Sequence, residues 1–245
     1  MSVAAAALDL LFPPTCGACR APLPALVLLC DDCACAAVRL GTDCCPRCSS
    51  PLQEASCPDC EARVEQLAAA GFDRARALYV YGGPIEDALL RTKFGDAPHL
   101  AQAAGKALAR ELVKGRLLAR ASSVDLVVPI PVGRARLRER GYDQALLMAR
   151  PVARALKRPL APLLLTRTRE TPPQARLGRA ARARNVAGAF AVAPRYAHGP
   201  GLRERVVLLV DDVLTTGATA DAAAAALKSA GAKRVEVLTL ARALL

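Results

Sequence analysis

The stretch from Val207 to Thr219 places two adjacent carboxylates between an apolar run and a loop of threonine and glycine. The apolar residues 207–210 predict a fully buried parallel strand, because a strand covered on both faces loses the polar alternation. The Ala-rich run 220–230 predicts a helix directly after the loop. Free backbone N–H groups and the helix dipole both favour an anion at such a loop. The strand, loop and helix together therefore predict a phosphate-binding site.

The two carboxylates of this stretch, Asp211 and Asp212, need a separate explanation. They would emerge at the carboxyl edge of the strand, where open α/β sheets bind ligands. Sugar hydroxyls or a hydrated Mg²⁺ would offset their charge beside a phosphate, and a ribose 5-phosphate carries both hydroxyls and phosphate. This hypothesis requires that the acids face an open crevice and are not capped by the chain's own side chains. The alternative, a buried strand ending in a solvated turn, explains neither the acid pair nor the glycine loop.

All thirteen positions resemble the signature that binds 5-phosphoribosyl 1-pyrophosphate (PRPP) in type I phosphoribosyltransferases, namely an apolar run, an acid pair and Thr-x-Gly-x-Thr. The resemblance assigns Asp211 and Asp212 to the ribose hydroxyls. It assigns the 5-phosphate to the loop residues Thr215, Thr216, Gly217, Ala218 and Thr219. Glycine allows a close backbone approach, and the threonines add hydroxyl donors.

Eight of the ten cysteines form four Cys-x-x-Cys pairs: Cys16/Cys19, Cys30/Cys33, Cys45/Cys48 and Cys57/Cys60. Two such pairs complete a tetrahedral S₄ site, which suits zinc. Sequential pairing gives two zinc ribbons, with one or two structural zinc ions, and a crossed pairing stays open. Cys35 and Cys44 are left over, as bystanders or alternative ligands. Segment 16–60 has five acidic and three basic residues, and this net negative charge disfavours binding of nucleic acid. The favoured role of the metal sites is to stabilise a segment that is too small to fold alone. A protein-docking surface is the second possibility.

The net charge of +12 is concentrated in one segment, because residues 134–184 carry fourteen Arg or Lys against three Asp or Glu. This concentration predicts a positive field near one site, with phosphates of PRPP or of nucleic acid as natural partners. Aromatic residues make up only 3% and Trp is absent, so stacking platforms for single strands are scarce.

The rest of the chain predicts an α/β fold, with a small N-terminal zinc-ribbon domain (1–66) and a phosphoribosyltransferase-like domain (67–245) whose parallel sheet is flanked by helices. We expect strands at 77–81, 125–130, 206–210 and 234–240. We expect helices at 4–12, 61–71, 85–92, 99–118, from 139 or 142 to 156, and at 220–230. The basic loop 92–96 is expected to end one helix. Residues 167–188 are expected to form a long loop, either a functional lid or disordered.

The whole chain resembles the ComF family of competence-protein F homologues. The resemblance rests on the cysteine series, Tyr81-Gly82-Gly83-Pro84, Lys93-Phe94-Gly95-Asp96, Val128-Pro129-Ile130-Pro131, Arg140-Gly141-Tyr142-Asp143-Gln144, Arg167-x-Arg169-x-Thr171-x-x-Gln174-x-x-Leu177, Arg184-Asn185-Val186-x-Gly188-Ala189-Phe190 and the PRPP loop. One departure is Asp143, where the family usually has Asn, and whose charge would alter anion binding if it contacts a ligand.

The resemblance implies a double zinc ribbon joined to a phosphoribosyltransferase-like domain. The turn 129–134, with Pro131 and Val132, would hold the pyrophosphate of PRPP, and Arg140 also belongs to the binding set. Lys93, Arg167 and Arg169 would close over it as catalytic cations beside the acid pair, because cations stabilise a leaving pyrophosphate.

Three functions are compatible with this pattern. The first is an enzyme that transfers phosphoribose from PRPP, with Mg²⁺, to an unidentified acceptor. A purine base is disfavoured as acceptor, because Thr215 replaces the acid that purine-salvage enzymes carry there. The second is a catalytically silent PRPP or nucleotide sensor, or an adaptor among DNA-uptake proteins in natural transformation. The third is direct binding of single-stranded DNA. Residues 1–11 lack a basic signal-peptide region and 25–29 are too few to span a bilayer, so we expect a cytoplasmic protein without membrane insertion.

Overall fold

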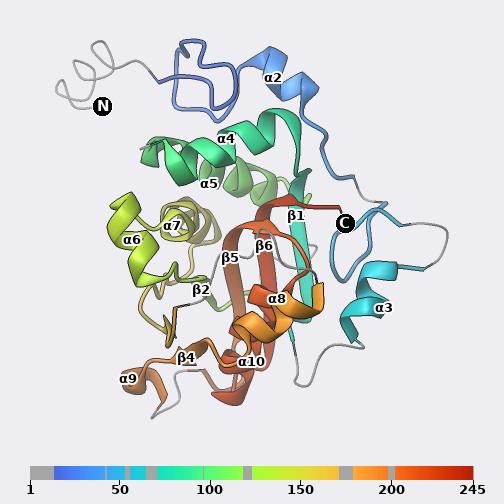
Figure 1. Ribbon diagram of the computed structural model, residues 1–245, viewed down its shortest axis with the longest axis vertical. Coiled ribbons are helices and arrows are strands. Elements are labelled where there is room, and N and C mark those ends of the chain that lie inside the picture. The colour runs from blue at the N-terminus through green and yellow to red at the C-terminus, as the bar shows by residue number, and fades with distance from the viewer. Residues whose placement is uncertain are drawn as a thin grey trace.

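The computed structural model describes residues 14–41, 43–52, 56–64, 71–95, 97–117, 123–170, 179–197 and 202–244. Its centre is a four-stranded sheet in the order β1-β6-β5-β2 (Figure 1). The strands are β1 (Arg74–Val80), β6 (Arg234–Arg242), β5 (Val206–Leu214) and β2 (Leu126–Pro129), and all three neighbouring pairs are parallel. The parallel α/β sheet that the sequence predicts is therefore confirmed.

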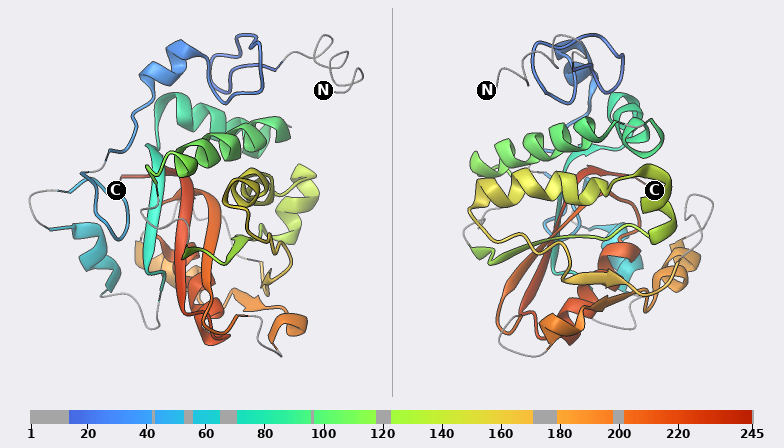
Figure 2. Two further views of the ribbon diagram at one scale, coloured as in Figure 1. Left: turned by 180° about the vertical axis from the view of Figure 1, so that it is seen from behind. Right: turned by 90° about the vertical axis from the view of Figure 1, so that its left-hand side faces the viewer.

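Helices cover both faces of this sheet (Figures 1 and 2). On one side lie α4 (Gly83–Phe94), α5 (Pro98–Val113) and α7 (Gln144–Leu156), and on the other α10 (Ala218–Ser229) with α8 (Arg179–Val186). Successive side chains of a strand point to opposite faces, so β5 contributes to two cores. Leu208 and Val210 pack with α5 and α7, whereas Val207 and Leu209 pack with α10. Burial on both faces explains the unbroken apolar run.

The N-terminal segment covers the outer edge of the sheet. Its described residues include the short helices α2 (Asp31–Ala36) and α3 (Pro58–Val64). The backbone N–H of Leu40 donates to the carbonyl of Leu78 at 3.0 Å, and that of Val80 donates to Val38 at 2.9 Å. Further along β1, the N–H of Ala75 donates to the carbonyl of Arg47 at 2.8 Å. Backbone groups of edge strand β1 are thus paired with residues 38, 40 and 47, which protects an edge that would otherwise be open.

Several boundaries differ from the sequence-based expectation. β5 runs on through the two aspartates to Leu214, β1 begins at Arg74, and α4 includes Lys93, which was expected in a loop. The sequence analysis does not predict α6 (Arg134–Arg140), α8, or the hairpin of β3 (Leu165–Arg167) with β4 (Phe190–Val192). A short helix, α9 (Pro194–Ala197), follows β4. The expected long loop 167–188 therefore holds the end of a strand and a helix.

Some expectations fall outside the described residues. These are the helix at 4–12, residues 65–70 of the linker helix at 61–71, and the motif residues Asp96, Thr171, Gln174 and Leu177. Within the described ranges, no helix has the length and apolar character needed to cross a membrane.

Candidate functional site

The phosphate-binding loop that the sequence predicts lies between β5 and α10. β5 ends at Leu214 and α10 begins at Ala218, so residues 215–217 form a very short connection. Gly217 precedes the helix with φ +85°, a conformation that glycine adopts without steric cost. A Cβ atom added there would lie 3.2 Å from the ring of Phe72. The tight turn therefore depends on glycine for both conformation and space.

A small pocket opens beside this connection. Its lining is formed by Asp211, Val213, Leu214, Thr215, Gly217, Thr219 and Ala220, with Val237 and Thr239 from the neighbouring strand β6. Three of the five predicted phosphate-loop residues thus line the pocket. Thr216 is buried, and its hydroxyl accepts from the backbone N–H of Ala218 at 3.4 Å. Thr216 and Ala218 therefore stabilise the turn itself, and the pocket surface comes from the other three.

Asp212 lies on the opposite face of β5 from the pocket, and a lysine neutralises it. The Nζ atom of Lys93, in the last turn of α4, lies 2.8 Å from Oδ2 of Asp212. Asp212 is only 6% exposed. Burial acts to raise the pKa of Asp212, but attraction to Lys93 outweighs it and holds the pKa below its usual value. Burial likewise acts to lower the pKa of Lys93, and attraction to Asp212 raises it instead.

Asp211 has a different environment from its neighbour. Its Oδ1 atom accepts from the backbone N–H of Asp212 at 2.8 Å, and it is partly exposed at the pocket. Burial and then the charge of Asp212 raise the pKa of Asp211 well above its usual value. The open crevice that the ribose hypothesis requires is present for Asp211. For Asp212 the requirement is not met, because Lys93 caps it.

The predicted pyrophosphate turn follows β2, which neighbours β5 in the sheet. Pro131 and Val132 are partly exposed there, and the N–H of Val132 donates to Oδ2 of Asp143 at 3.5 Å. Asp143 is also the N-cap of α7, where its Oδ1 accepts from the N–H of Leu146 at 2.9 Å. Asp and Asn cap helices equally well, which accounts for the departure from the family pattern. Burial raises the pKa of the Asp143 carboxyl.

The three predicted arginines lie in different places. Arg140 donates to Oε1 of Gln144 at 3.0 Å, and its charge helps to lower the pKa of Asp212. Arg167 packs over the ring of Phe190, 5.3 Å from its centre. Burial, and then the charge of Arg136, lower the pKa of Arg167, and among the opposing charges is that of Asp211. Arg169 is exposed and donates to the carbonyl of Ala187 at 2.9 Å. Arg140 and Arg167 thus interact electrostatically with the acid pair, whereas Arg169 is bonded to the end of α8.

One further residue at the loop was not predicted. Arg242 ends β6, is 2% exposed, and donates to the carbonyl oxygens of Leu214 and Thr215. The sequence does place this arginine directly after the apolar residues of a predicted buried strand. A buried charge at such a position needs specific partners. The sequence alone does not say what these partners are.

The cysteines form two four-sulfur sites, Cys16/Cys19/Cys30/Cys33 and Cys45/Cys48/Cys57/Cys60, so the sequential pairing is confirmed. Tetrahedral zinc with bonds of about 2.3 Å places its sulfurs about 3.8 Å apart. The sulfurs of Cys19 and Cys30 are 3.7 Å apart, and those of Cys48 and Cys57 are 3.5 Å apart. Both sites therefore fit a structural zinc ion. Cys35 is exposed and, like Cys44, belongs to neither site.

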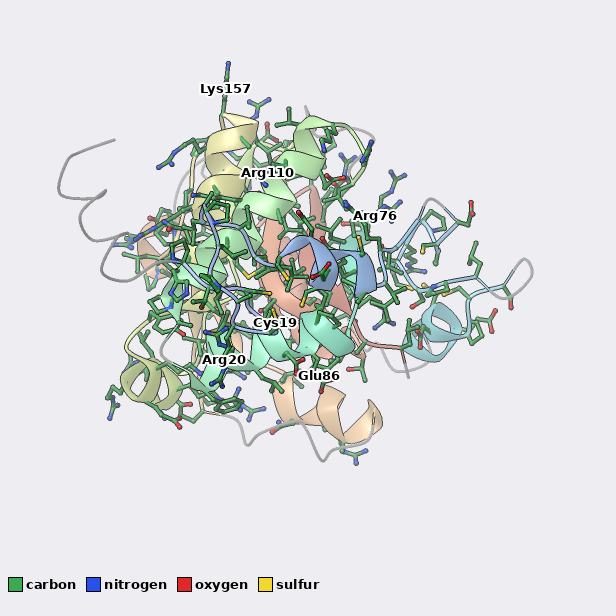
Figure 3. The ribbon with its side chains drawn as sticks, turned by 90° about the horizontal axis from the view of Figure 1, so that it is seen from above. Cys19, Arg20, Arg76, Glu86, Arg110 and Lys157 are labelled. Carbon is green, nitrogen blue, oxygen red and sulfur yellow. The ribbon has the colours of Figure 1, made fainter. Side chains whose placement is uncertain are left out.

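The two sites lie against different parts of the sheet domain. Figure 3 looks down on the first, where Cys19 lies above α4, and it labels Arg76 of β1 on the side of the second. Arg91 of α4 donates to the carbonyl of Cys16 at 2.6 Å, and Arg76 donates to that of Pro46 at 2.8 Å. An arginine of the sheet domain thus holds each ribbon.

Two models of known families match separate parts of the chain. Residues 7–66 match the model of a double zinc ribbon domain, and residues 142–244 match that of a phosphoribosyl transferase domain. The second match contains α7, the β5–α10 loop and Arg242.

Three curated relatives extend this similarity. DNA utilization protein YhgH of Salmonella typhimurium is 30% identical over 233 residues, which cover 95% of this chain and 98% of the relative. Competence protein F of Haemophilus influenzae is 34% identical over 119 residues, covering 49% of this chain and 51% of that protein. Competence protein ComFC of Streptococcus pneumoniae is 26% identical over 215 residues, 87% of each chain. The chain therefore belongs to the ComF family, in which a double zinc ribbon is joined to a phosphoribosyltransferase-type domain.

Proposed function

We propose that this protein binds PRPP, or another phosphorylated ribose, at the connection between β5 and α10. The observation that carries the proposal is the pocket that Asp211, Thr215, Gly217 and Thr219 line at the start of α10. Loop N–H groups and the helix dipole would hold the 5-phosphate. Asp211, which is partly exposed at this pocket, would accept hydrogen bonds from the ribose hydroxyls.

The Lys93–Asp212 ion pair gives the proposal a second step. In the structure Lys93 neutralises Asp212. A pyrophosphate group offers Lys93 a more highly charged partner, so the bound state would turn Lys93 towards it and release Asp212 for a ribose hydroxyl or for Mg²⁺. Carboxylate oxygens suit Mg²⁺, which would supply charge neutralisation at the pyrophosphate. Arg140 and Arg167 add positive charge on the same side, where the leaving group would develop negative charge.

The reaction class that follows is transfer of the phosphoribosyl group to an acceptor nucleophile. Thr215 does not provide a general base at neutral pH, so the acceptor must bring its own nucleophilicity or its own base. A protein that only senses PRPP would use the same pocket without this last step. Release of pyrophosphate with a panel of bases, amines and nucleotides distinguishes them, because a sensor binds without turnover.

Calorimetric titration of the zinc-loaded chain with PRPP and Mg²⁺ tests the binding proposal. We expect a saturable signal, and a loss of at least about tenfold in affinity for Asp211→Asn. Glu204→Gln is the matched control, because it removes one carboxylate at an exposed position that pairs with Lys233. Absence of wild-type binding, or equal affinity of Asp211→Asn and wild type, would rule out the proposed site.

A second candidate is single-stranded DNA binding in DNA utilization or competence, the roles that the relatives' names state. The specific observation in its favour is α6, whose Arg134 and Arg138 are exposed. Binding to phosphates releases counterions, so affinity should fall steeply with salt. Binding that is independent of salt, or unchanged in Arg134→Gln/Arg138→Gln, would contradict this candidate.

A further inference from the structure

The buried guanidinium of Arg242 connects two regions that are far apart in sequence. On one side, NH1 donates to the carbonyl oxygens of Leu214, at 3.0 Å, and of Thr215. Leu214 and Thr215 form the end of β5 and the start of the phosphate loop. Because both contacts are to backbone, they determine where the chain leaves the sheet, and hence where the loop N–H groups point.

The other side of the same guanidinium contacts the second zinc ribbon. NH2 of Arg242 lies 2.6 Å from Oδ2 of Asp59, and Nε donates to the hydroxyl of Ser50 at 2.9 Å. The hydroxyl of Ser50 also donates to Oδ2 of Asp59 at 2.7 Å, which closes a triangle of three residues. The Asp59 side chain is 17% exposed, so this ion pair is largely shielded from water.

Both ribbon residues are held directly by the second four-sulfur site. Asp59 lies between Cys57 and Cys60, two of its four cysteines. Ser50 follows Cys48, whose thiol sulfur lies 3.4 Å from the Ser50 hydroxyl. A metal bound by these cysteines therefore fixes the position of the carboxylate that neutralises Arg242.

We propose that the second zinc ribbon positions the phosphate loop, with Arg242 as the positioning residue and with Asp59 and Ser50 transmitting the geometry of the metal site. Arg242 presents its donors in a planar fork, so partners on two edges fix both its position and its orientation. A buried guanidinium that loses its carboxylate is an uncompensated charge, and it moves or takes in water. Either change removes its hold on the carbonyls of Leu214 and Thr215. The effect on ligand affinity rests on the proposed function, whereas the coupling itself is measurable without ligand.

The first ribbon does not share this arrangement among the residues that the structure describes. Arg91 of α4 donates to the carbonyls of Cys16 and Gly17, and apolar side chains of this ribbon lie in the same core cluster as those of α4. The second ribbon also has a contact that bypasses the loop. Arg76 donates to the carbonyls of Pro46, at 2.8 Å, and of Cys45, at 3.5 Å (Figure 3 labels Arg76). Arg76 thus provides a control that loosens the same ribbon without touching the loop.

Hydrogen exchange of the zinc-loaded, ligand-free full chain tests the coupling. We expect Asp59→Asn to speed exchange in the peptide covering residues 214–219 by at least about fivefold, and Arg76→Gln to leave it at the wild-type rate. Zinc content is measured alongside, and both variants should keep the wild-type metal content. Ser50→Ala is the second variant, used if Asp59→Asn fails to fold or loses zinc. Wild-type exchange in the variant that retains zinc, or equal acceleration in Arg76→Gln, would overturn the proposal.

A binding measurement separates this inference from the proposed function. If wild type binds PRPP, Asp59→Asn should weaken binding by about five- to tenfold, and Arg76→Gln should leave it unchanged. Faster exchange at 214–219 with unchanged affinity would overturn the positioning role. If wild type binds no PRPP, the proposed function fails, and the hydrogen-exchange result still decides whether the ribbon holds the loop.

Discussion

The Nζ atom of Lys93 lies 2.8 Å from Oδ2 of Asp212, so the last turn of α4 is fastened to the end of β5. The same turn carries Arg91, which donates to the carbonyl of Cys16 in the first ribbon. α4 therefore lies between a metal site and the acid pair. The lysine that the sequence places in a loop is held on a helix, with its charge already neutralised before any ligand is present.

Lys93→Met should destabilise the fold at neutral pH, because it leaves Asp212 buried without its partner. Removing one member of a buried pair costs about 3 kcal/mol. The pKa of Asp212, now held low by Lys93, should rise in the variant. Protonation then relieves the penalty, so the loss should shrink as the pH falls from 7 to 5. Urea unfolding at both pH values measures this loss of stability.

Lys228→Met is the control, because it breaks the Lys228–Asp73 pair elsewhere in the fold. An equal loss of stability at pH 7 and pH 5 in Lys93→Met would contradict the expectation.

Asp211→Asn should stabilise the protein while it weakens ligand binding. The pKa of Asp211 is raised in the folded state, so the native chain binds this proton more tightly than the unfolded chain. Wild type therefore loses stability as the pH rises from the unfolded pKa of about 3.9 through the native pKa, and Asn avoids this loss.

Melting temperatures between pH 4 and 8 test the sign of this effect. The difference between Asp211→Asn and wild type should grow in favour of the variant as the pH rises. Glu204→Gln should show the opposite sign, because Lys233 lowers the pKa of Glu204. A variant that is less stable than wild type at pH 8 would contradict the raised pKa of Asp211.

Gly217→Ala should cost about 1–2 kcal/mol of stability, since an L-residue at φ +85° is strained. The added methyl would also lie 3.2 Å from the Phe72 ring, so the loop should shift and PRPP affinity should fall. Gly41→Ala is a matched control, because its added Cβ would meet nothing closer than 4.0 Å. Thermal unfolding and calorimetric titration measure the two effects, and two variants that behave alike would show that the turn tolerates a side chain.

Metal analysis should give two zinc ions per chain, one for each four-cysteine site. Cys45→Ser should reduce this to one, and Cys35→Ser should leave it at two, because Cys35 is exposed and outside both sites. Metal binding and folding of such small segments are coupled, so a strong chelator should also lower the melting temperature. Retention of two ions in Cys45→Ser would contradict the ligand assignment.

The strand, loop and helix of the candidate site were predictable because all their determinants lie within about twenty residues. Val207–Val210 are apolar without interruption, and Gly217 marks the turn. The cysteine sites were equally local in their spacing. In contrast, α6 has the sequence RARLRER and α8 has RAARARNV, so neither shows an apolar face that would identify a helix. The three-residue strands β3 and β4 pair across more than twenty intervening residues, which no local pattern indicates.

The contacts between distant residues could not be read from the sequence. Asp59 and Arg242 meet across 183 positions, and Lys93 meets Asp212 from another layer of the fold. The family resemblance implies that Lys93 contacts pyrophosphate and that Asp212 contacts a sugar, whereas in the structure the two side chains form an ion pair. Which partner each charge has depends on packing, and packing is a property of the whole chain.

The backbone pairing of residues 38, 40 and 47 with β1 has a consequence for how such a chain can be shortened. Deletion of the cysteine-rich segment would not leave a sheet domain that folds and functions by itself. It would strip one side of the sheet and leave a row of unsatisfied amide and carbonyl groups, inviting copies of the protein to stack edge to edge. Such a deletion should therefore first make the protein insoluble. Any segment that replaced this one would have to pair with the same edge of the sheet.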